Sequence, residues 1–173
     1  ELLDIIGIPY LRSNYEAEVV CAQLNRKNIV HGCITEDSDY LTNCGNYLLR
    51  NFNINSNSII LYKFHILLKE LGLNNKQFID FCILCGCDYT SKIYGIGPVK
   101  ALQLIKKYGN IENIISYINS IKSKYIIPED FNYIKARELF RMDIYNNLEL
   151  ENIKKSIKLR NDVDITKCLK FFT

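Results

Sequence analysis

The chain has 173 residues, of which 48% are hydrophobic and 24% charged, and its formal net charge is +3. These values are ordinary for a soluble globular protein and suit one compact domain or the larger piece of one. No apolar run reaches the roughly 18–20 residues that a membrane-spanning helix needs, so we expect no membrane association. The small net charge does not by itself indicate nucleic-acid binding, which would have to come from local patches.

The cysteine content favours a reduced, intracellular protein. The seven cysteines are odd in number, and most lie inside apolar runs, which is unlike a disulfide scaffold. Cys82, Cys85 and Cys87 are spaced closely enough to suggest a zinc knuckle. A structural zinc site needs four ligands, however, and no second Cys/His pair follows at finger-like spacing. We therefore expect these thiols to pack in the interior.

The first forty residues predict an alternation of helix and strand. Glu1–Gly7 is typical of the last turns of an amphipathic helix closed by a glycine, and the only methionine lies far downstream, so we expect a segment to precede Glu1. Ile8–Leu11 predicts a short strand near a sheet edge because it contains a proline. Asn14–Arg26 has helical spacing, Asn28–Ile34 predicts a buried strand, and Thr35–Asp39 predicts the polar loop that follows it.

The rest of the chain predicts two more strands and then only helices. The strands are expected at Tyr47–Leu49 and Ser58–Tyr62, with an Asn/Ser-rich turn between them. The helices are expected at Phe64–Leu71, Asn74–Cys85, Pro98–Tyr108, Ile111–Ile121 and Asn132–Arg141, before a tail without a clear pattern. Strands alternating with helices indicate an α/β fold.

Five acidic residues lie where the chain turns. Glu16 and Glu18 lie at the start of a predicted helix, where acids ordinarily just complement the helix dipole. Asp37 and Asp39 directly follow a predicted strand, where an Asp-rich turn is common but where α/β proteins also bind ligands. Asp88 follows an apolar helix, where an aspartate is ordinarily a turn or cap residue.

Considered together, these carboxylates favour a site for hard divalent cations. Magnesium takes oxygen ligands from a few carboxylates, from water and from substrate phosphate. Two such ions about 4 Å apart can generate hydroxide and stabilise the leaving oxygen of a phosphodiester. Without a cation, carboxylates this dense would repel one another and raise each other's pKa. A metal site is the simplest explanation if they converge.

The segment Ile93–Gly109 is typical of a helix-hairpin-helix element. Gly95-Ile96-Gly97 allows a tight turn, and the proline that follows suits a first helical position. Backbone N–H groups at such a helix start can bind a DNA phosphate. The residues expected to contact DNA are Gly95, Ile96, Gly97, Lys100, Lys106 and Lys107. Such an element binds the DNA backbone without reading bases, and its binding weakens with salt.

Four motifs resemble, in order and spacing, the internal nuclease region of flap endonucleases, whose relatives are the xeroderma G-type and exonuclease-one-type 5′ nucleases. They are Glu16-Ala17-Glu18, Thr35-Glu36-Asp37-Ser38-Asp39, Gly86-Cys87-Asp88-Tyr89 and Gly95-Ile96-Gly97-Pro98. The flanking Gly7-Ile8-Pro9-Tyr10 agrees as well. The resemblance covers roughly residues 1–120 and fades beyond them.

The resemblance implies a fold and an activity. Residues 1–90 would form the later part of a PIN-like α/β 5′ nuclease core, a parallel-type sheet flanked by helices. Residues 91–173 would form a helix-two-turn-helix region with a helical tail. The implied protein is a structure-specific 5′ flap endonuclease and 5′–3′ exonuclease of DNA replication and repair, located in the nucleus and acting on branched or flapped duplex DNA.

The resemblance also implies a catalytic metal site. The family uses two magnesium ions, which manganese can replace, and seven acidic residues. By motif, Glu16 and Glu18 would serve the first metal, and Asp37, Asp39 and Asp88 the second. The other two acids of the family would lie upstream of this chain, so we expect the chain by itself to be a poor nuclease.

Further ligands and alternative functions stay open from the sequence. The family binds potassium through hairpin carbonyls, here those of Ile93 and Ile96, and a serine whose position is taken by Lys92, with Ser91 one place earlier. A sliding clamp would bind through a segment not present here, because Cys168–Phe172 has the wrong spacing and is expected to be an apolar helix. The alternatives are a non-catalytic relative that binds the DNA backbone, and an RNA-directed PIN nuclease.

Overall fold

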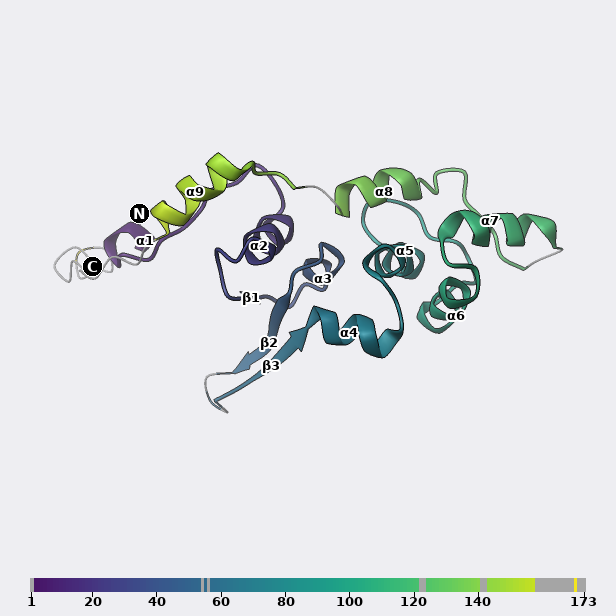
Figure 1. The fold of residues 1–173 in the computed structure, drawn as a ribbon, viewed down its shortest axis with the longest axis horizontal. Coiled ribbons are helices and arrows are strands. Elements are labelled where there is room, and N and C mark those ends of the chain that lie inside the picture. The colour runs from purple at the N-terminus through teal and green to yellow at the C-terminus, as the bar shows by residue number, and fades with distance from the viewer. Residues whose placement is uncertain are drawn as a thin grey trace.

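A computed structural model of the chain describes residues 2–53, 55, 57–121, 124–140, 143–157 and 170. The helices are α1 (Leu2–Ile5), α2 (Ala17–Arg26), α3 (Asp39–Thr42), α4 (Phe64–Leu71), α5 (Asn75–Cys85), α6 (Pro98–Tyr108), α7 (Ile111–Ser120), α8 (Tyr133–Phe140) and α9 (Asn147–Ser156). Figure 1 shows α5 to α8 gathered at one end of an elongated molecule, the sheet with α2 and α3 in the middle, and α1 with α9 at the other end. Within the described residues, no helix is long and apolar enough to span a membrane.

A mixed three-stranded sheet lies between α2 and α4. Its strands are β1 (Cys33–Ile34), β2 (Tyr47–Asn53) and β3 (Ser58–Lys63), in that order across the sheet. β1 pairs with β2 in parallel, and β2 pairs with β3 as an antiparallel hairpin. The two strands predicted around this hairpin are confirmed, and both extend beyond the predicted bounds.

The prediction of a buried strand over Asn28–Ile34 is wrong for most of that segment. Only its last two residues form β1, and Ile34 is 62% exposed. The preceding residues close α2 instead: Asn28 adopts a left-handed conformation (φ 56°), and the Ile29 N–H donates to the Leu24 carbonyl at 2.9 Å. Because these backbone groups bond to the end of the helix, they are not free to pair in a sheet.

Two other expectations for the chain ends also need correction. Residues 8–11 do not form a strand, and their first backbone N–H, that of Ile8, donates back to Leu3 of α1 at 2.9 Å. The region expected to be a patternless tail contains α9, which begins in a capping box between Asn146 and Glu149. Except for residue 170, the apolar helix expected at residues 168–172 lies outside the described residues.

The predicted helices are otherwise present with small shifts. α2 begins at Ala17 rather than Asn14, Asp39 is the first residue of α3 rather than the end of a loop, and α8 covers Tyr133–Phe140. α5 starts in a capping box in which Asn74 and Gln77 satisfy each other's backbone N–H groups.

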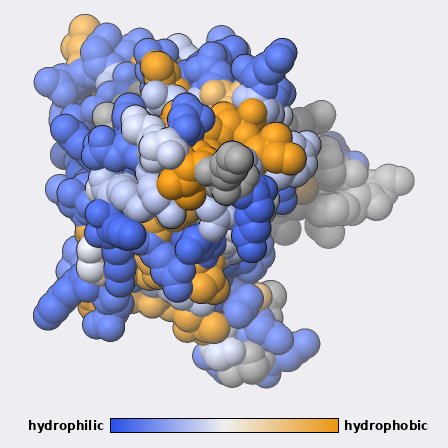
Figure 2. All heavy atoms as spheres, turned by 90° about the vertical axis from the view of Figure 1, so that its right-hand side faces the viewer, coloured by the Kyte–Doolittle hydropathy of each residue, from blue (hydrophilic) through white to orange (hydrophobic). Residues whose placement is uncertain are grey.

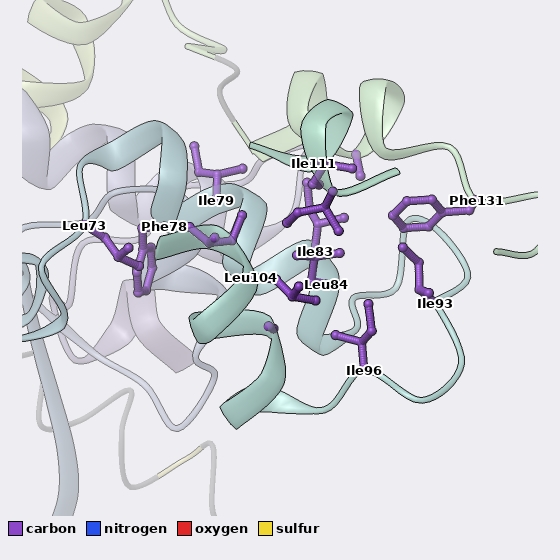
Figure 3. Packing of buried hydrophobic residues seen from close by; sticks show 14 of the residues in the cluster. Leu73, Phe78, Ile79, Ile83, Leu84, Ile93, Ile96, Leu104, Ile111 and Phe131 are labelled. Atoms are coloured by element: carbon purple, nitrogen blue, oxygen red, sulfur yellow. The ribbon is translucent and has the colours of Figure 1, made fainter. Parts of the chain in front are cut away.

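The main hydrophobic cluster joins the α5 to α8 helices, and Figure 3 shows its packing. Ile79, Ile83 and Leu84 of α5 lie against residues that follow the hairpin, such as Leu104 and Ile111. The cysteines of α5 pack against this cluster, which agrees with the expected role of their thiols. The cluster includes residues on both sides of residue 90, and the division of the chain there stays a prediction.

Candidate active site and DNA-binding hairpin

The loop that leaves β1 presents two aspartates. The Asp37 N–H donates to Thr35 Oγ1 at 3.1 Å, and the Asp39 N–H donates to Asp37 Oδ1 at 2.9 Å. Asp39 begins α3, and its neighbour Tyr40 is fully buried and anchors the helix. The loop is therefore held by its own hydrogen bonds and by a buried side chain, and Asp39 is half-buried where the loop enters the helix.

Glu36, the third acid of this loop, is engaged elsewhere. Its carboxylate accepts from the Asn51 N–H at 2.7 Å and from Arg50 Nε at 3.2 Å. The Asn51 N–H, together with Arg50, lowers the pKa of Glu36 from its ordinary value. Glu36 thus ties the loop to β2, and this separates it from the two aspartates beside it.

Glu16 and Glu18 lie at the start of α2. Glu16 is the N-cap residue, but its side chain makes no capping hydrogen bond. Its carboxylate instead accepts a short hydrogen bond from the Tyr89 hydroxyl, next to Asp88. Burial, and then this bond to Glu16, raise the pKa of Tyr89. The Glu16 side chain is therefore held by Tyr89 and does not cap α2.

Asp88 reaches the same region from the end of α5. Gly86 follows the helix with φ at 115°, a conformation that L side chains rarely adopt, and the chain then turns so that Cys87 bridges Thr90. Asp88 is exposed inside this turn. Tyr89, the next residue, packs its ring on Phe140 of α8 with centroids 4.9 Å apart.

The pKa of Asp39 is affected by the other four predicted ligands. Burial raises the pKa of Asp39 most, and the charges of Asp37, Asp88, Glu16 and Glu18 raise it further. These carboxylates therefore share one neighbourhood, although they come from three separate parts of the chain. In the part of the chain that the structure describes, no three acidic, histidine or cysteine side chains are close enough together to hold a metal ion. The arrangement is an open carboxylate cluster, and a divalent cation suits it because positive charge would relieve the repulsion at Asp39.

The hairpin before α6 is anchored by two buried isoleucines. Ile93 and Ile96 are 0% and 4% exposed, and Figure 3 shows both within the packed cluster. Gly95 lies between them with φ at 84°. A Cβ at Gly97, the N-cap of α6, would meet nothing within 4 Å. The two isoleucine side chains thus fix the loop to the core, while the backbone at Gly97 is left open to close approach by another molecule.

An extended segment around Ile126, which was not predicted from the sequence, pairs with this hairpin. The Tyr94 N–H donates to the Ile126 carbonyl at 2.9 Å, and the Ile126 N–H donates back at 3.4 Å. The ring of Tyr125 lies 3.2 Å from where a Cβ of Gly95 would be. In Figure 2, which views this end of the molecule, hydrophilic side chains cover much of the face, with a large apolar patch in its upper part and smaller apolar areas toward its lower edge.

The predicted DNA-binding lysines fall into two groups. Lys100 lies in the first turn of α6, next to the open glycine backbone. Lys106 and Lys107 lie in the last turn, about 10 Å from Lys100 along the axis of the helix. Lys107 Nζ lies 5.1 Å from the ring centroid of Tyr108, and that ring stacks on Tyr117. The structure therefore does not bring these two lysines to the hairpin, and their contact with DNA stays a prediction.

The chain shares sequence with proteins named as nucleases. The XPG I-region family model matches residues 7–88. Flap endonuclease 1 of Branchiostoma floridae is 44% identical over 144 residues, which cover 82% of this chain and 37% of that protein. Flap endonuclease 1 of Tetrahymena thermophila is 38% identical over 146 residues, covering 81% and 38%. The chain spans less than half the length of these relatives.

Solved structures agree with this similarity. The catalytic core of Rad2 is 28% identical, with a TM-score of 0.82 over 99% of this chain and 64% of that one. The flap endonuclease-1 from Methanococcus jannaschii is 18% identical with a TM-score of 0.65, over 96% and 56%, and shows the fold alone. Together with the mixed α/β sheet, these matches define a PIN-like 5′ nuclease core.

The family follows from the sequence matches. The chain belongs to the flap-endonuclease family of 5′ nucleases, whose XPG I-region it carries. The resemblance inferred from the four motifs is thereby confirmed.

Proposed function

We propose that the protein containing this chain is a structure-specific 5′ nuclease that hydrolyses DNA phosphodiesters at 5′ flaps in replication and repair. One observation carries the proposal: carboxylates from three segments of the chain lie near Asp39, where burial and then their negative charges raise its pKa. Its relatives named flap endonuclease 1 support this activity, and the Rad2 catalytic core was solved with a DNA substrate.

The five carboxylates would hold two magnesium ions, which manganese can replace. GEN1, a structural neighbour at 19% identity, was solved with product DNA and both ions. Bound there, the ions would supply an activated water and neutralise charge on the scissile phosphate. The chain's own groups position these ligands: Tyr89 orients the Glu16 carboxylate, and the hydrogen-bonded turn at Asp37 orients Asp39.

The hairpin would bind the duplex away from the scissile bond. The free N–H groups of the first turn of α6 favour a phosphate, and Lys100 adds positive charge there. The exposed glycine backbone at Gly97 lets a phosphate approach without contact with a side chain. Such binding is independent of base sequence, so the branched shape of the DNA would select the substrate.

Several further properties belong to the same proposal. Because the chain covers 38% of the length of its Tetrahymena relative, we infer that it is a poor nuclease without the rest of the protein. Nuclear location fits the proposed role and is tested by imaging the tagged protein. A sliding clamp would bind outside this chain, which a pull-down with the complete protein tests.

The proposed potassium site at the hairpin carbonyls has a specific test. The Ile93 carbonyl already accepts a hydrogen bond from the Ile96 N–H at 3.3 Å, which leaves it one further lone pair. Lys92 is exposed, and the stem of its side chain passes near Gly86. Replacing potassium by tetramethylammonium at equal ionic strength weakens DNA binding if the ion is needed and has no effect if it is not.

The decisive experiment compares three acids of one loop. In the complete protein, Asp37→Ala with Asp39→Ala abolishes magnesium-dependent cleavage of a labelled 5′-flap duplex and spares DNA binding. Glu36→Ala is the matched control, because its carboxylate is bonded to β2, and it retains cleavage. Magnesium-dependent cleavage by the double variant would overturn the metal assignment. An inactive wild-type protein that still binds flapped DNA would favour the non-catalytic relative, and cleavage of RNA flaps in preference to DNA would favour an RNA-directed nuclease.

A further inference from the structure

A buried carboxylate lies in the apolar core of the helical end. Asp80 on α5 is only 3% exposed, and both of its oxygens are engaged. Arg137 Nε donates to Oδ1 at 2.5 Å, and an Arg137 terminal nitrogen donates to Oδ2 at 2.6 Å. The Ile111 N–H, at the start of α7, donates to Oδ2 at 3.2 Å. A charge this deeply buried persists only with partners, and here it has three donors.

Arg137, on α8, also binds a second carboxylate, that of Glu112 on α7. Its guanidinium donates to Glu112 Oε1 at 2.5 Å and to Oε2 at 2.8 Å, so it forms two-pronged bonds with two carboxylates at once. It also lies over the ring of Tyr133, 5.0 Å from the centroid. We call the set Asp80, Glu112 and Arg137 the clamp. The clamp joins α5, α7 and α8 through directional bonds rather than through packing alone.

The clamp joins helices that connect to both of the proposed functional elements. α5 leads within three residues to Asp88, a proposed metal ligand, while α7 follows α6 across the short Gly109–Asn110 connection. The far end of α6 carries the DNA-binding hairpin, which Ile93 and Ile96 fix in the core. The helix α6 is therefore fixed near both ends relative to α5, by apolar packing at the hairpin and by the clamp near Lys106 and Lys107.

Stability alone does not account for an ionic clamp at this place. Apolar side chains of similar volume often stabilise a core as well as a buried ion pair or better. What a two-pronged pair adds is a fixed relative orientation of the groups that it joins. In a nuclease whose DNA grip and metal site lie on different helices, that orientation sets which phosphodiester reaches the metal ligands.

We propose that Asp80 and Arg137 are positioning residues of the nuclease: they fix the angle of α6 and α7 to α5 and thereby select the bond that is cut. The inference rests on the proposed function. Displacing a substrate by about 1 Å can lower a rate by about 100-fold even when the altered residue is far from the chemistry. Loss of the clamp should therefore affect cleavage more than binding.

The test uses the complete protein with two clamp variants. Arg137→Lys keeps the charge and loses the two-pronged geometry, and Asp80→Leu with Arg137→Met replaces the pair by apolar side chains of similar size. Lys135→Ala, an exposed change on the same helix, is the control. The measurements are thermal unfolding, affinity for a flapped duplex in calcium, the single-turnover cleavage rate at saturating DNA, and the position of incision on a sequencing gel.

A positioning role predicts a specific pattern. Arg137→Lys should bind DNA within about twofold of the wild type, cut about 10-fold more slowly or worse, and spread its incisions to neighbouring bonds. The apolar double variant should melt somewhat below the wild type, because the buried Ile111 N–H loses its acceptor, and should still cut at scattered positions. A purely structural role predicts that the folded double variant cuts at the wild-type position. Wild-type rate and incision position in both variants would overturn the inference. An inactive wild-type protein would instead refute the proposed function on which the inference depends.

Discussion

Replacing Gly45 by alanine tests how the Asp37–Asp39 loop is held. A Cβ at Gly45 would lie 2.2, 2.3 and 2.7 Å from three carbons of the Tyr40 ring. That ring is fully buried, and its hydroxyl donates to Asn25 Oδ1 at 2.8 Å, so it cannot slide away without breaking this bond. Since Tyr40 directly follows Asp39, the strain would be felt at the proposed metal ligand.

The size of the effect follows from three contributions. Overpacking a tight core costs about 1–3 kcal/mol, and weakening the Tyr40 hydrogen bond costs about 1 kcal/mol. The lower entropy of the unfolded alanine chain offsets about 0.4–1 kcal/mol, because Gly45 does not have a positive φ and alanine can adopt its conformation. The net loss of unfolding free energy is about 2 kcal/mol, or about 4–8 °C in Tm for a chain of this length.

The assay is urea unfolding of the protein followed by circular dichroism. Gly45→Ala should lower the urea midpoint without changing the slope. Tyr40→Phe removes the hydroxyl anchor, so the double variant should lose less than the sum of the two single losses. A Gly45→Ala midpoint equal to that of the wild type would refute the reasoning, because the ring would then have moved at no cost.

Three other changes probe the two proposed sites and the clamp. Gly97→Ala should change the unfolding free energy by less than about 0.5 kcal/mol, because the added Cβ would meet no atom within 4 Å. The same variant should bind DNA more weakly, because the methyl group lies where a phosphate is proposed to approach. Unchanged affinity in a fluorescence titration would contradict the hairpin contact. Tyr89→Phe should keep the ring packing and raise the magnesium concentration for half-maximal cleavage about 10-fold, because the charged Glu16 carboxylate loses the hydrogen bond that the Tyr89 hydroxyl donates. The same magnesium dependence as in the wild type would exclude this orienting role. Arg137 lowers the pKa of Glu112 below its ordinary 4.5, so the ionised Glu112 stabilises the folded protein. This stabilisation is fully present above pH 4.5 and is lost as the pH falls through the lowered pKa. The free energy of unfolding, measured with a chemical denaturant between pH 6 and 3, should therefore decline more steeply in the wild type than in Glu112→Gln.

Local patterns were sufficient for much of the architecture. The capping residue at Asn74, the alternation around the β2–β3 hairpin and the glycines before α6 act over a few residues, and the predicted helices and strands there are confirmed. The strand predicted over residues 28–34 failed because apolar residues favour a strand only when a partner strand is available. Here the end of α2 takes the backbone hydrogen bonds first. α9 was missed because its apolar face is short and packs on α2, more than a hundred residues earlier.

The sequence by itself determined the family and predicted the five acids and the glycine hairpin, because each motif is carried by neighbouring residues. Only the tertiary structure decided which side chains lie close to each acid. It brought Glu16 to Tyr89 across 73 positions and tied Glu36 to β2, away from the aspartates beside it. It also paired the buried Asp80 with Arg137, 57 positions away. The sequence pattern of α5 had indicated only an apolar helix. Such pairs depend on how the helices pack, and the spacing of residues along the chain carries no record of that packing.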